Sequence, residues 1–135
     1  MIVLDSSVLV GIIKGEQDSG EHLELIATEQ CIIGAPTLVE ARAWCAMNLK
    51  ARSSRWLEDF ISEESVSIVP FSREMADIAS RAFVAFGKAS GHPAKLNFGD
   101  SMAYAVAMAM RAPLLFKGQD FGRTDVMMHP ASVRK

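Results

Sequence analysis

The chain has 135 residues, of which 50% are hydrophobic and 22% are charged. This length and composition predict one globular domain over residues 1–135, and they exclude a disordered or collagen-like chain. The net charge of -2 shows no overall basic character of the kind that marks many nucleic-acid binders. If four of the acids belonged to a metal site, however, the rest of the molecule would carry a net charge of +2, so the charge of the whole chain is a poor guide.

Short apolar runs alternate with segments of helical period along the chain. Strands are predicted at residues 2–4, 31–33, 66–69 and 114–116, with residues 126–128 as a candidate fifth. Helices are predicted at residues 8–15, 20–29, 36–49, 56–61, 72–86 and 98–111. Strands that alternate with helices predict an α/β fold, with a central parallel sheet of four to five strands flanked by helices.

Four carboxylates occupy related places in this pattern. Asp5 directly follows the first predicted strand, and Glu40 and Asp100 lie near the starts of the third and sixth predicted helices. The residues three, four and seven positions after Glu40 and after Asp100 are apolar or aromatic, so both acids continue core-facing stripes. Asp120 follows the fourth strand, within the loop KGQDF.

These acids are expected to meet at one edge of the sheet. The carboxyl ends of parallel strands and the amino ends of the following helices lie on the same side, where α/β folds keep their sites. Carboxylates held together repel and desolvate one another, and a hard cation such as Mg²⁺ or Mn²⁺ relieves both effects. Each acid alone can instead be a helix cap or a turn residue. Three acids on apolar stripes at one edge favour a metal site over capping alone.

The segments that carry these acids resemble the PIN-domain ribonucleases: IVLDSSVLV, APTLVEA, LNFGDSMAYAVA and LLFKGQDFGRTD. They look most like the VapC toxins of bacterial type II toxin–antitoxin pairs, and the resemblance covers essentially the whole chain. It implies a three-layer PIN-like fold and a metal-dependent endoribonuclease toxin that cleaves structured or single-stranded RNA, such as tRNA, rRNA or mRNA. It also implies a cognate VapB-like antitoxin that neutralises the toxin, and a toxin homodimer.

The resemblance assigns roles to individual residues as well. The catalytic acids are Asp5, Glu40, Asp100 and Asp120. The direct ligands of one or two Mg²⁺ or Mn²⁺ ions are Asp5, Asp100 and Asp120, while Glu40 binds through water or orients the attacking water. The hydroxyl beside the first acid comes from Ser6 or Ser7.

Four cations in predicted loops are candidates for contacts with RNA phosphates. They are Lys88, Lys95, Lys117 and Arg123. Each of them can instead be a solvated surface charge, and the sequence alone does not decide between this role and a contact with RNA.

The sequence is also compatible with two other classes of protein. An aspartate directly after the first strand also begins phosphatases of the haloacid dehalogenase type, but these need a second acid two residues later, where this chain has Ser7. The other class is a PIN-like module that only binds RNA or protein. Cleavage of RNA that depends on a metal distinguishes a nuclease from both.

The remaining expectations concern partners and location. Residues 8–13, 44–47 and 56–61 carry more large apolar side chains than a thin core needs, so an amphipathic antitoxin helix is expected to bind between these helices. Cys31 and Cys45 lie in apolar surroundings and are expected as buried free thiols. The first apolar stretch is too short to span a membrane and lacks the basic start of a signal peptide, so we expect a cytoplasmic protein.

Overall fold

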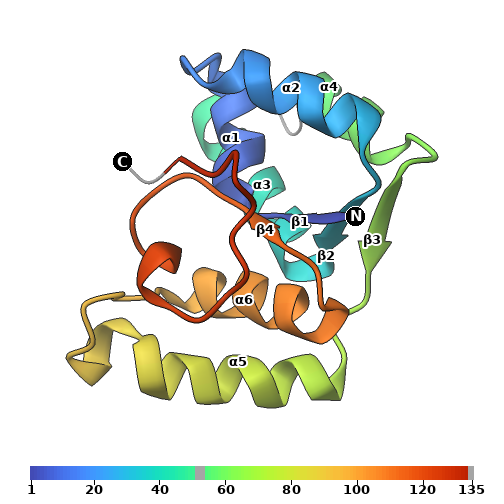
Figure 1. The fold of residues 1–135 in the computed structure, drawn as a ribbon. Helices are drawn as coiled ribbons and strands as arrows, with labels where there is room; N and C mark the ends of the chain where they lie inside the picture. The colour runs from blue at the N-terminus through green and yellow to red at the C-terminus, as the bar shows by residue number, and fades with distance from the viewer. Residues whose placement is uncertain (51–53, 134–135) are drawn as a thin grey trace.

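A computed structural model describes residues 1–50 and 54–133 of the chain. Within these residues, the strands β1 (Ile2–Leu4), β2 (Cys31–Gly34), β3 (Val66–Val69) and β4 (Leu114–Leu115) form one parallel sheet. The strand order is β3-β2-β1-β4. The first strand therefore lies inside the sheet, and the chain that leaves it at Asp5 emerges at the centre of the carboxyl edge (Figure 1).

Helices cover both faces of this sheet (Figure 1). They are α1 (Ser6–Lys14), α2 (Ser19–Thr28), α3 (Ala35–Asn48), α4 (Arg55–Ile61), α5 (Arg73–Phe86) and α6 (Phe98–Met110). Side chains of a strand point alternately to its two faces. Val3 and Ile32 accordingly pack in a core with α5 and α6, whereas Leu4 and Ile33 pack in a second core with α1 to α4. This arrangement confirms the predicted three-layer α/β fold.

Local sequence signals explain where several helices begin and end. The side chains of Asp5, Ser54, Ser72 and Asn97 each accept a hydrogen bond from a backbone amide in the first turn of the helix that follows. Gly15 ends α1 with φ of 69°, in the left-handed region that glycine adopts without strain. The helix starts that position Asp5 and Asp100 are therefore encoded locally.

The candidate fifth strand is the main difference from the predicted elements. Among the described residues, 126–128 contribute only an isolated parallel bridge between Leu114 and Met128. Beyond this bridge the Phe116 amide donates to the Ser132 hydroxyl at 3.2 Å and not to a backbone carbonyl, so the ladder does not continue. Both cysteines are buried and free, as expected. No helix in the described part of the chain has the length and apolar composition that crossing a membrane requires.

Candidate active site

The carboxyl edge of the sheet brings the four predicted acids into one electrostatic neighbourhood. Asp5 caps α1 directly after β1, and Glu40 lies in the second turn of α3 after β2. Asp100 lies in the first turn of α6, and the exposed Asp120 follows β4 just before a 3-10 turn. The negative charges of Asp5, Asp120 and Glu40 all raise the pKa of Asp100. Acids that are up to 95 positions apart, Asp5 and Asp100, thus act on one another.

Asp5 is the most buried of these acids, with only 3% of its surface exposed. Its Oδ2 accepts hydrogen bonds from the Ser7 amide at 3.1 Å and the Ser7 hydroxyl at 2.6 Å. The pKa of Asp5 is raised to about 6. Burial is the main cause and the charge of Glu40 adds to the rise, whereas the hydrogen bonds from Ser7 lower the pKa. Its Oδ1 is buried and has no hydrogen-bond partner among the described residues. A buried carboxylate oxygen left in this way is a position that a cation would satisfy.

Asp100 is held by a reciprocal capping box with Asn97. The Asn97 amide donates to Asp100 Oδ2 at 3.0 Å, and the Asp100 amide donates to Asn97 Oδ1 at 2.7 Å. Burial raises the pKa of Asp100 to about 7, and the neighbouring acids add to the rise, although the Asn97 hydrogen bond lowers it. Capping uses one oxygen of Asp5 and one of Asp100. The cap and the metal ligand are therefore compatible roles of the same side chain, not alternatives.

Glu40 reaches this site because α6 carries a glycine at the point of contact. A Cβ atom added at Gly99 would collide with the Glu40 carboxylate. Sequence reasoning missed Gly99, and no local signal identifies it, since the close approach joins α3 to α6. Asn97 was missed too, but an Asn three residues before an Asp at a helix start is a readable capping signal.

The two hydroxyls beside the first acid have different surroundings. Ser7 contacts Asp5 with its side chain and also accepts a hydrogen bond from the Lys117 amide at 2.9 Å. Ser6 acts on Asp5 through its backbone, which lowers the pKa of that carboxyl. Ser7 is therefore the hydroxyl that holds the first acid.

The four candidate cations fall into three situations. Lys95 and Arg123 line a hollow of about 290 Å³ together with Asp120. Lys88 is exposed on a short 3-10 turn and is not among the residues that line this hollow. The Lys117 ammonium is paired with Glu16 at 3.0 Å and with Asp18 at 3.4 Å, and its side chain is only 13% exposed. These two carboxylates already neutralise the ammonium, so Lys117 is poorly suited to bind a phosphate in this arrangement.

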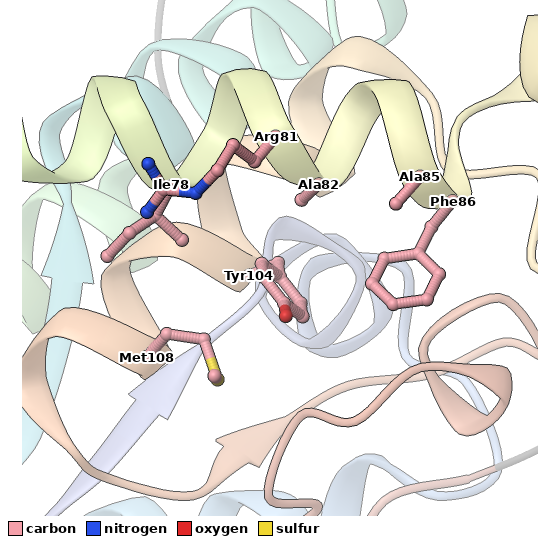
Figure 2. Close-up of a pocket in the computed structure, with 7 residues that line it drawn as sticks. All are labelled: Ile78, Arg81, Ala82, Ala85, Phe86, Tyr104 and Met108. Atoms are coloured by element: carbon pink, nitrogen blue, oxygen red, sulfur yellow. The ribbon is translucent and has the colours of Figure 1, made fainter.

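A separate hollow of about 410 Å³ lies between α5 and α6 (Figure 2). Its lining is mostly apolar, with Ile78, Phe86 and Met108 around Tyr104 and one cation, Arg81. The Tyr104 hydroxyl donates to Asp125 at 2.5 Å, and burial together with that carboxylate raises the pKa of Tyr104. None of the four acids lines this hollow, so we do not place the chemistry there.

The acids form an open arrangement. Their charges act on one another, yet no three of the described His, Cys, Asp or Glu residues stand close enough to form a closed ligand cluster. Mg²⁺ fits an open arrangement of this kind, since it usually keeps several waters and takes only one or two carboxylates directly. The orphaned oxygen of Asp5 and the hard oxygen donors of the set fit the divalent ion that the sequence predicts.

Comparison with known proteins supports one family. A family model described as PIN domain matches residues 2–127. Ribonuclease VapC28 of Mycobacterium tuberculosis is 35% identical over 130 residues, which cover 93% of this chain and 95% of that protein. Among solved structures, a toxin–antitoxin complex from Klebsiella pneumoniae superposes with a TM-score of 0.65 at 16% identity, covering 98% of this chain and 96% of the other. Mycobacterium tuberculosis VapC20, described as a toxin that cleaves the sarcin-ricin loop, superposes with a TM-score of 0.65 at 16% identity, covering 83% of this chain and 85% of the other.

Proposed function

Because this chain belongs to the PIN-domain family, we propose that it is a metal-dependent endoribonuclease toxin of the VapC type. Cleavage of RNA is what the names of its 35% identical relatives state. The observation that supports the metal dependence is the buried Asp5 Oδ1, which has no hydrogen-bond partner in the described part of the chain. The charge of Asp5 also contributes to the raised pKa of Asp100. A phosphatase of the haloacid dehalogenase type is not favoured, because Ser7 stands where its second acid would be. The intact set of acids likewise disfavours a module that only binds.

Asp5, Asp100 and Asp120 are the residues that would hold one or two Mg²⁺ or Mn²⁺ ions. When bound, such an ion supplies positive charge at the attacked phosphate and lowers the pKa of a water molecule. Ser7 immobilises Asp5 through Oδ2, so that Oδ1 is available. Glu40, placed against Gly99, is positioned to orient the attacking water or to accept its proton.

RNA is expected to approach over the hollow that Lys95, Arg123 and Asp120 line. Two cations next to an exposed acid can hold the phosphates on either side of the cleaved bond, while an ion offsets the acid itself. Lys88, exposed on the preceding turn, would extend the contact along the backbone of the RNA. Which RNA is cut depends on contacts with unpaired bases that these cations do not specify.

A cognate antitoxin is the expected partner of this chain. A hollow of about 310 Å³ between α2 and α4 is lined by Leu23, Ile26, Trp56 and Phe60. Trp56 stacks on Phe60 with their ring centroids 5.1 Å apart, which makes a firm apolar wall. We assign this hollow to the apolar face of an antitoxin helix. This hollow shares Trp56 and Phe60 with the groove that the sequence predicts, but residues 8–13 and 44–47 do not line it and its other wall is α2.

A second copy of the chain is expected on the opposite layer. Phe98 on α6 is 70% exposed and Val84 on α5 is 77% exposed. Phe98 also lines a hollow of about 350 Å³ with Phe83 and Met102. Apolar surface of this kind fits a homodimer contact better than free solvent.

The decisive experiment measures cleavage of total RNA by the purified chain with Mn²⁺, with Mg²⁺ and with EDTA. We expect cleavage with either metal, none in EDTA, and none for Asp5→Asn with either metal. Undiminished cleavage in EDTA would contradict the metal dependence, and no cleavage under any condition would contradict the nuclease. Co-expression with the neighbouring open reading frame should give a complex that no longer cuts RNA.

A further inference from the structure

We propose that Lys117 is a positioning residue of the active site, which holds the Ser7 hydroxyl against Asp5 through ion pairs with the turn after α1, and that it is not a contact for RNA. The inference rests on the proposed function, since it concerns how the same site is kept in order. It also reassigns one of the four cations that the sequence offered as RNA contacts.

The side chain of Lys117 is fixed at both ends. It starts directly after the buried Phe116 and ends on Glu16 and Asp18, at 3.0 and 3.4 Å. Its stem lies along α1 at Gly11, where an added Cβ would come within 3.1 Å of Lys117 Cδ. A largely buried ammonium needs its counter-charges, because losing them leaves a desolvated charge unpaired. The lysine therefore ties the end of β4 to the turn that follows α1.

The backbone of the same residue reaches the catalytic acid through one hydroxyl. The Lys117 amide donates to Ser7 Oγ at 2.9 Å, and Ser7 Oγ donates to Asp5 Oδ2 at 2.6 Å. Because the hydroxyl already accepts a bond from the amide, its own hydrogen is directed at Asp5. This chain of two bonds occupies Oδ2, whereas Oδ1 accepts no hydrogen bond from the residues that the structure describes.

Three attachments set the position of that amide. The pairing of β1 with β4 fixes the residues just before it, since the Asp5 amide donates to the Leu115 carbonyl at 3.0 Å. On one side, the C-terminal segment pairs with the loop, since Val133 donates to the Phe116 carbonyl at 2.9 Å and Gly118 donates to the Val133 carbonyl at 2.7 Å. On the other side, the Lys117 side chain supplies its ion pairs with the turn after α1. Removing the ammonium leaves the loop held by strand pairing and by the C-terminal segment, so we expect the fold to remain while the Ser7 bond loses one of the contacts that orient it.

The test compares Lys117→Met, Lys117→Arg and Ser7→Ala, with Lys95→Met as the matched lysine variant in the hollow beside Asp120. The measurements are kcat and KM for RNA cleavage, and the affinity for Mn²⁺ alone by calorimetry. Lys117→Met should lower kcat and Mn²⁺ affinity by about 10-fold with KM unchanged, the usual range for a residue that orients a ligand. Lys117→Arg should recover most of the loss. Lys95→Met should chiefly raise KM.

Coupling to Ser7 gives a readout that a general structural role would not move. Adding Lys117→Met to Ser7→Ala should lower kcat and Mn²⁺ affinity little beyond Ser7→Ala, because both changes break one chain of contacts. Fully multiplicative losses would overturn the proposal. A higher KM for Lys117→Met at unchanged kcat and Mn²⁺ affinity would overturn it too, and would make Lys117 an RNA contact.

A second variant covers the case in which Lys117→Met does not fold. The double change Glu16→Gln with Asp18→Asn keeps the lysine but removes its counter-charges. The positioning role predicts a lower kcat and weaker Mn²⁺ binding, whereas an RNA-binding role predicts a lower KM because the ammonium is released. If the wild-type chain cuts no RNA, the proposed function fails, and the Mn²⁺ affinities of the wild type, Ser7→Ala and this double variant decide the role of Lys117.

Discussion

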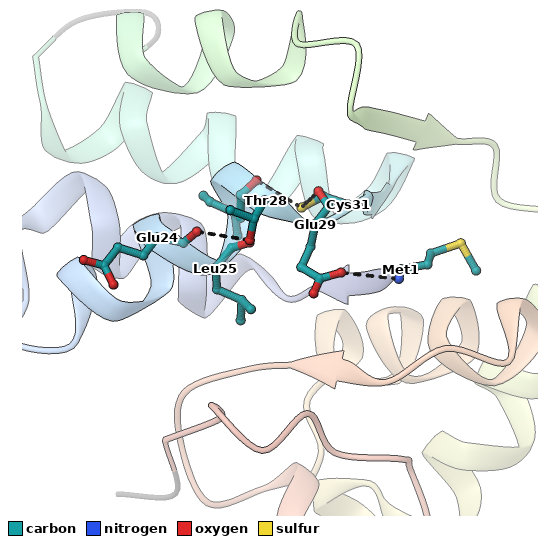
Figure 3. Close-up of polar contacts among 7 residues, drawn as sticks. Met1, Glu24, Leu25, Thr28, Glu29 and Cys31 are labelled. Atoms are coloured by element: carbon teal, nitrogen blue, oxygen red, sulfur yellow. Dashed lines mark hydrogen bonds and ion pairs between the residues drawn. The ribbon is translucent and has the colours of Figure 1, made fainter.

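The charged groups at the two edges of the sheet differ in their burial and in their partners. At the amino edge, the Glu29 carboxylate lies 3.7 Å from the N-terminal ammonium of Met1, and the Thr28 hydroxyl donates to the Leu25 carbonyl at 3.1 Å (Figure 3). At the carboxyl edge, Asp5 is buried and the charge of Glu40 raises its pKa, and its Oδ1 has no hydrogen-bond partner within residues 1–50 and 54–133.

This contrast separates the acids proposed to bind a metal from acids that are simply solvated. Met1 and Glu29 are both almost half exposed, so water and the ion pair satisfy them and the pair contributes little to stability. Asp5 and Asp100 are held where their pKa values rise to about 6 and about 7, a cost that a bound cation would relieve. Burial of carboxylates without a counter-charge therefore distinguishes the proposed active-site edge better than the number of acids does.

The largest expected effect is on RNA cleavage. Asp100→Asn should lower kcat/KM by at least about 100-fold, because even residues that merely orient metal ligands cost 10- to 100-fold. Glu29→Gln is the matched change at the amino edge and should leave cleavage unaltered. Equal activities of the two variants, measured with Mn²⁺ on the same RNA, would remove the distinction between the edges.

Metal binding should stabilise the carboxyl edge alone. At a free Mn²⁺ concentration about 100 times its dissociation constant, the free energy of unfolding of the wild type should rise by about 2.7 kcal/mol. Glu29→Gln should gain as much, and Asp100→Asn much less. Thermal melts across a Mn²⁺ titration measure all three, and a wild type indifferent to Mn²⁺ would return Asp5 and Asp100 to being helix caps only.

The pH dependence of stability without metal is the next largest effect. The folded pKa values of Asp5 and Asp100 lie above their ordinary value of 3.8, so the folded chain holds more protons than the unfolded chain between about pH 4 and pH 7. Stability should therefore fall as pH rises through this window. Asp100→Asn should flatten the fall by on the order of 1–2 kcal/mol, a reduced figure because Asp100 is partly open to solvent.

Denaturant unfolding in EDTA at several pH values measures this difference. At pH 7 the metal-free Asp100→Asn variant should be at least as stable as the metal-free wild type, whereas loss of a simple charged cap would make it less stable. Glu29→Gln should reproduce the wild-type curve. A wild type that gains stability from pH 4 to pH 7 relative to Asp100→Asn would contradict the raised pKa values.

The smallest expected effect concerns the glycine that admits Glu40. Gly99→Ala would place a methyl group against the Glu40 carboxylate, which can rotate away, so the fold should persist while kcat falls by roughly 10-fold. Gly20→Ala on α2 meets nothing within 4 Å and should stabilise the chain by about 0.5–1 kcal/mol without changing kcat. Melts and cleavage assays on both variants test this, and an unaltered kcat for Gly99→Ala would show that the exact place of Glu40 is unimportant.

Short-range patterns were enough to predict most of the fold. The strand at residues 66–69, the cap at Ser72 and the end of the first helix at Gly15 all lie where the sequence placed them, since each depends on neighbours a few positions away. The electrostatic proximity of Asp100 to Asp5, Glu40 and Asp120 agrees with the prediction that these acids share one edge, because any parallel sheet brings strand ends and helix starts to the same side. The segment 126–128 was ambiguous, since a short apolar run does not reveal whether a partner strand accepts it.

The tertiary structure decided which partner each polar atom has at the carboxyl edge of the sheet. The bond that fixes Ser7 comes from Lys117, 110 positions away, and the space for Glu40 comes from Gly99 on another helix. Lys117 looked like a loop cation in the sequence, because nothing near it signals that the ammonium turns towards Glu16 and Asp18. Periodicity and capping are written in adjacent residues, whereas the choice of which carboxylate oxygen stays free depends on contacts that exist only once strands β1 and β4 lie side by side.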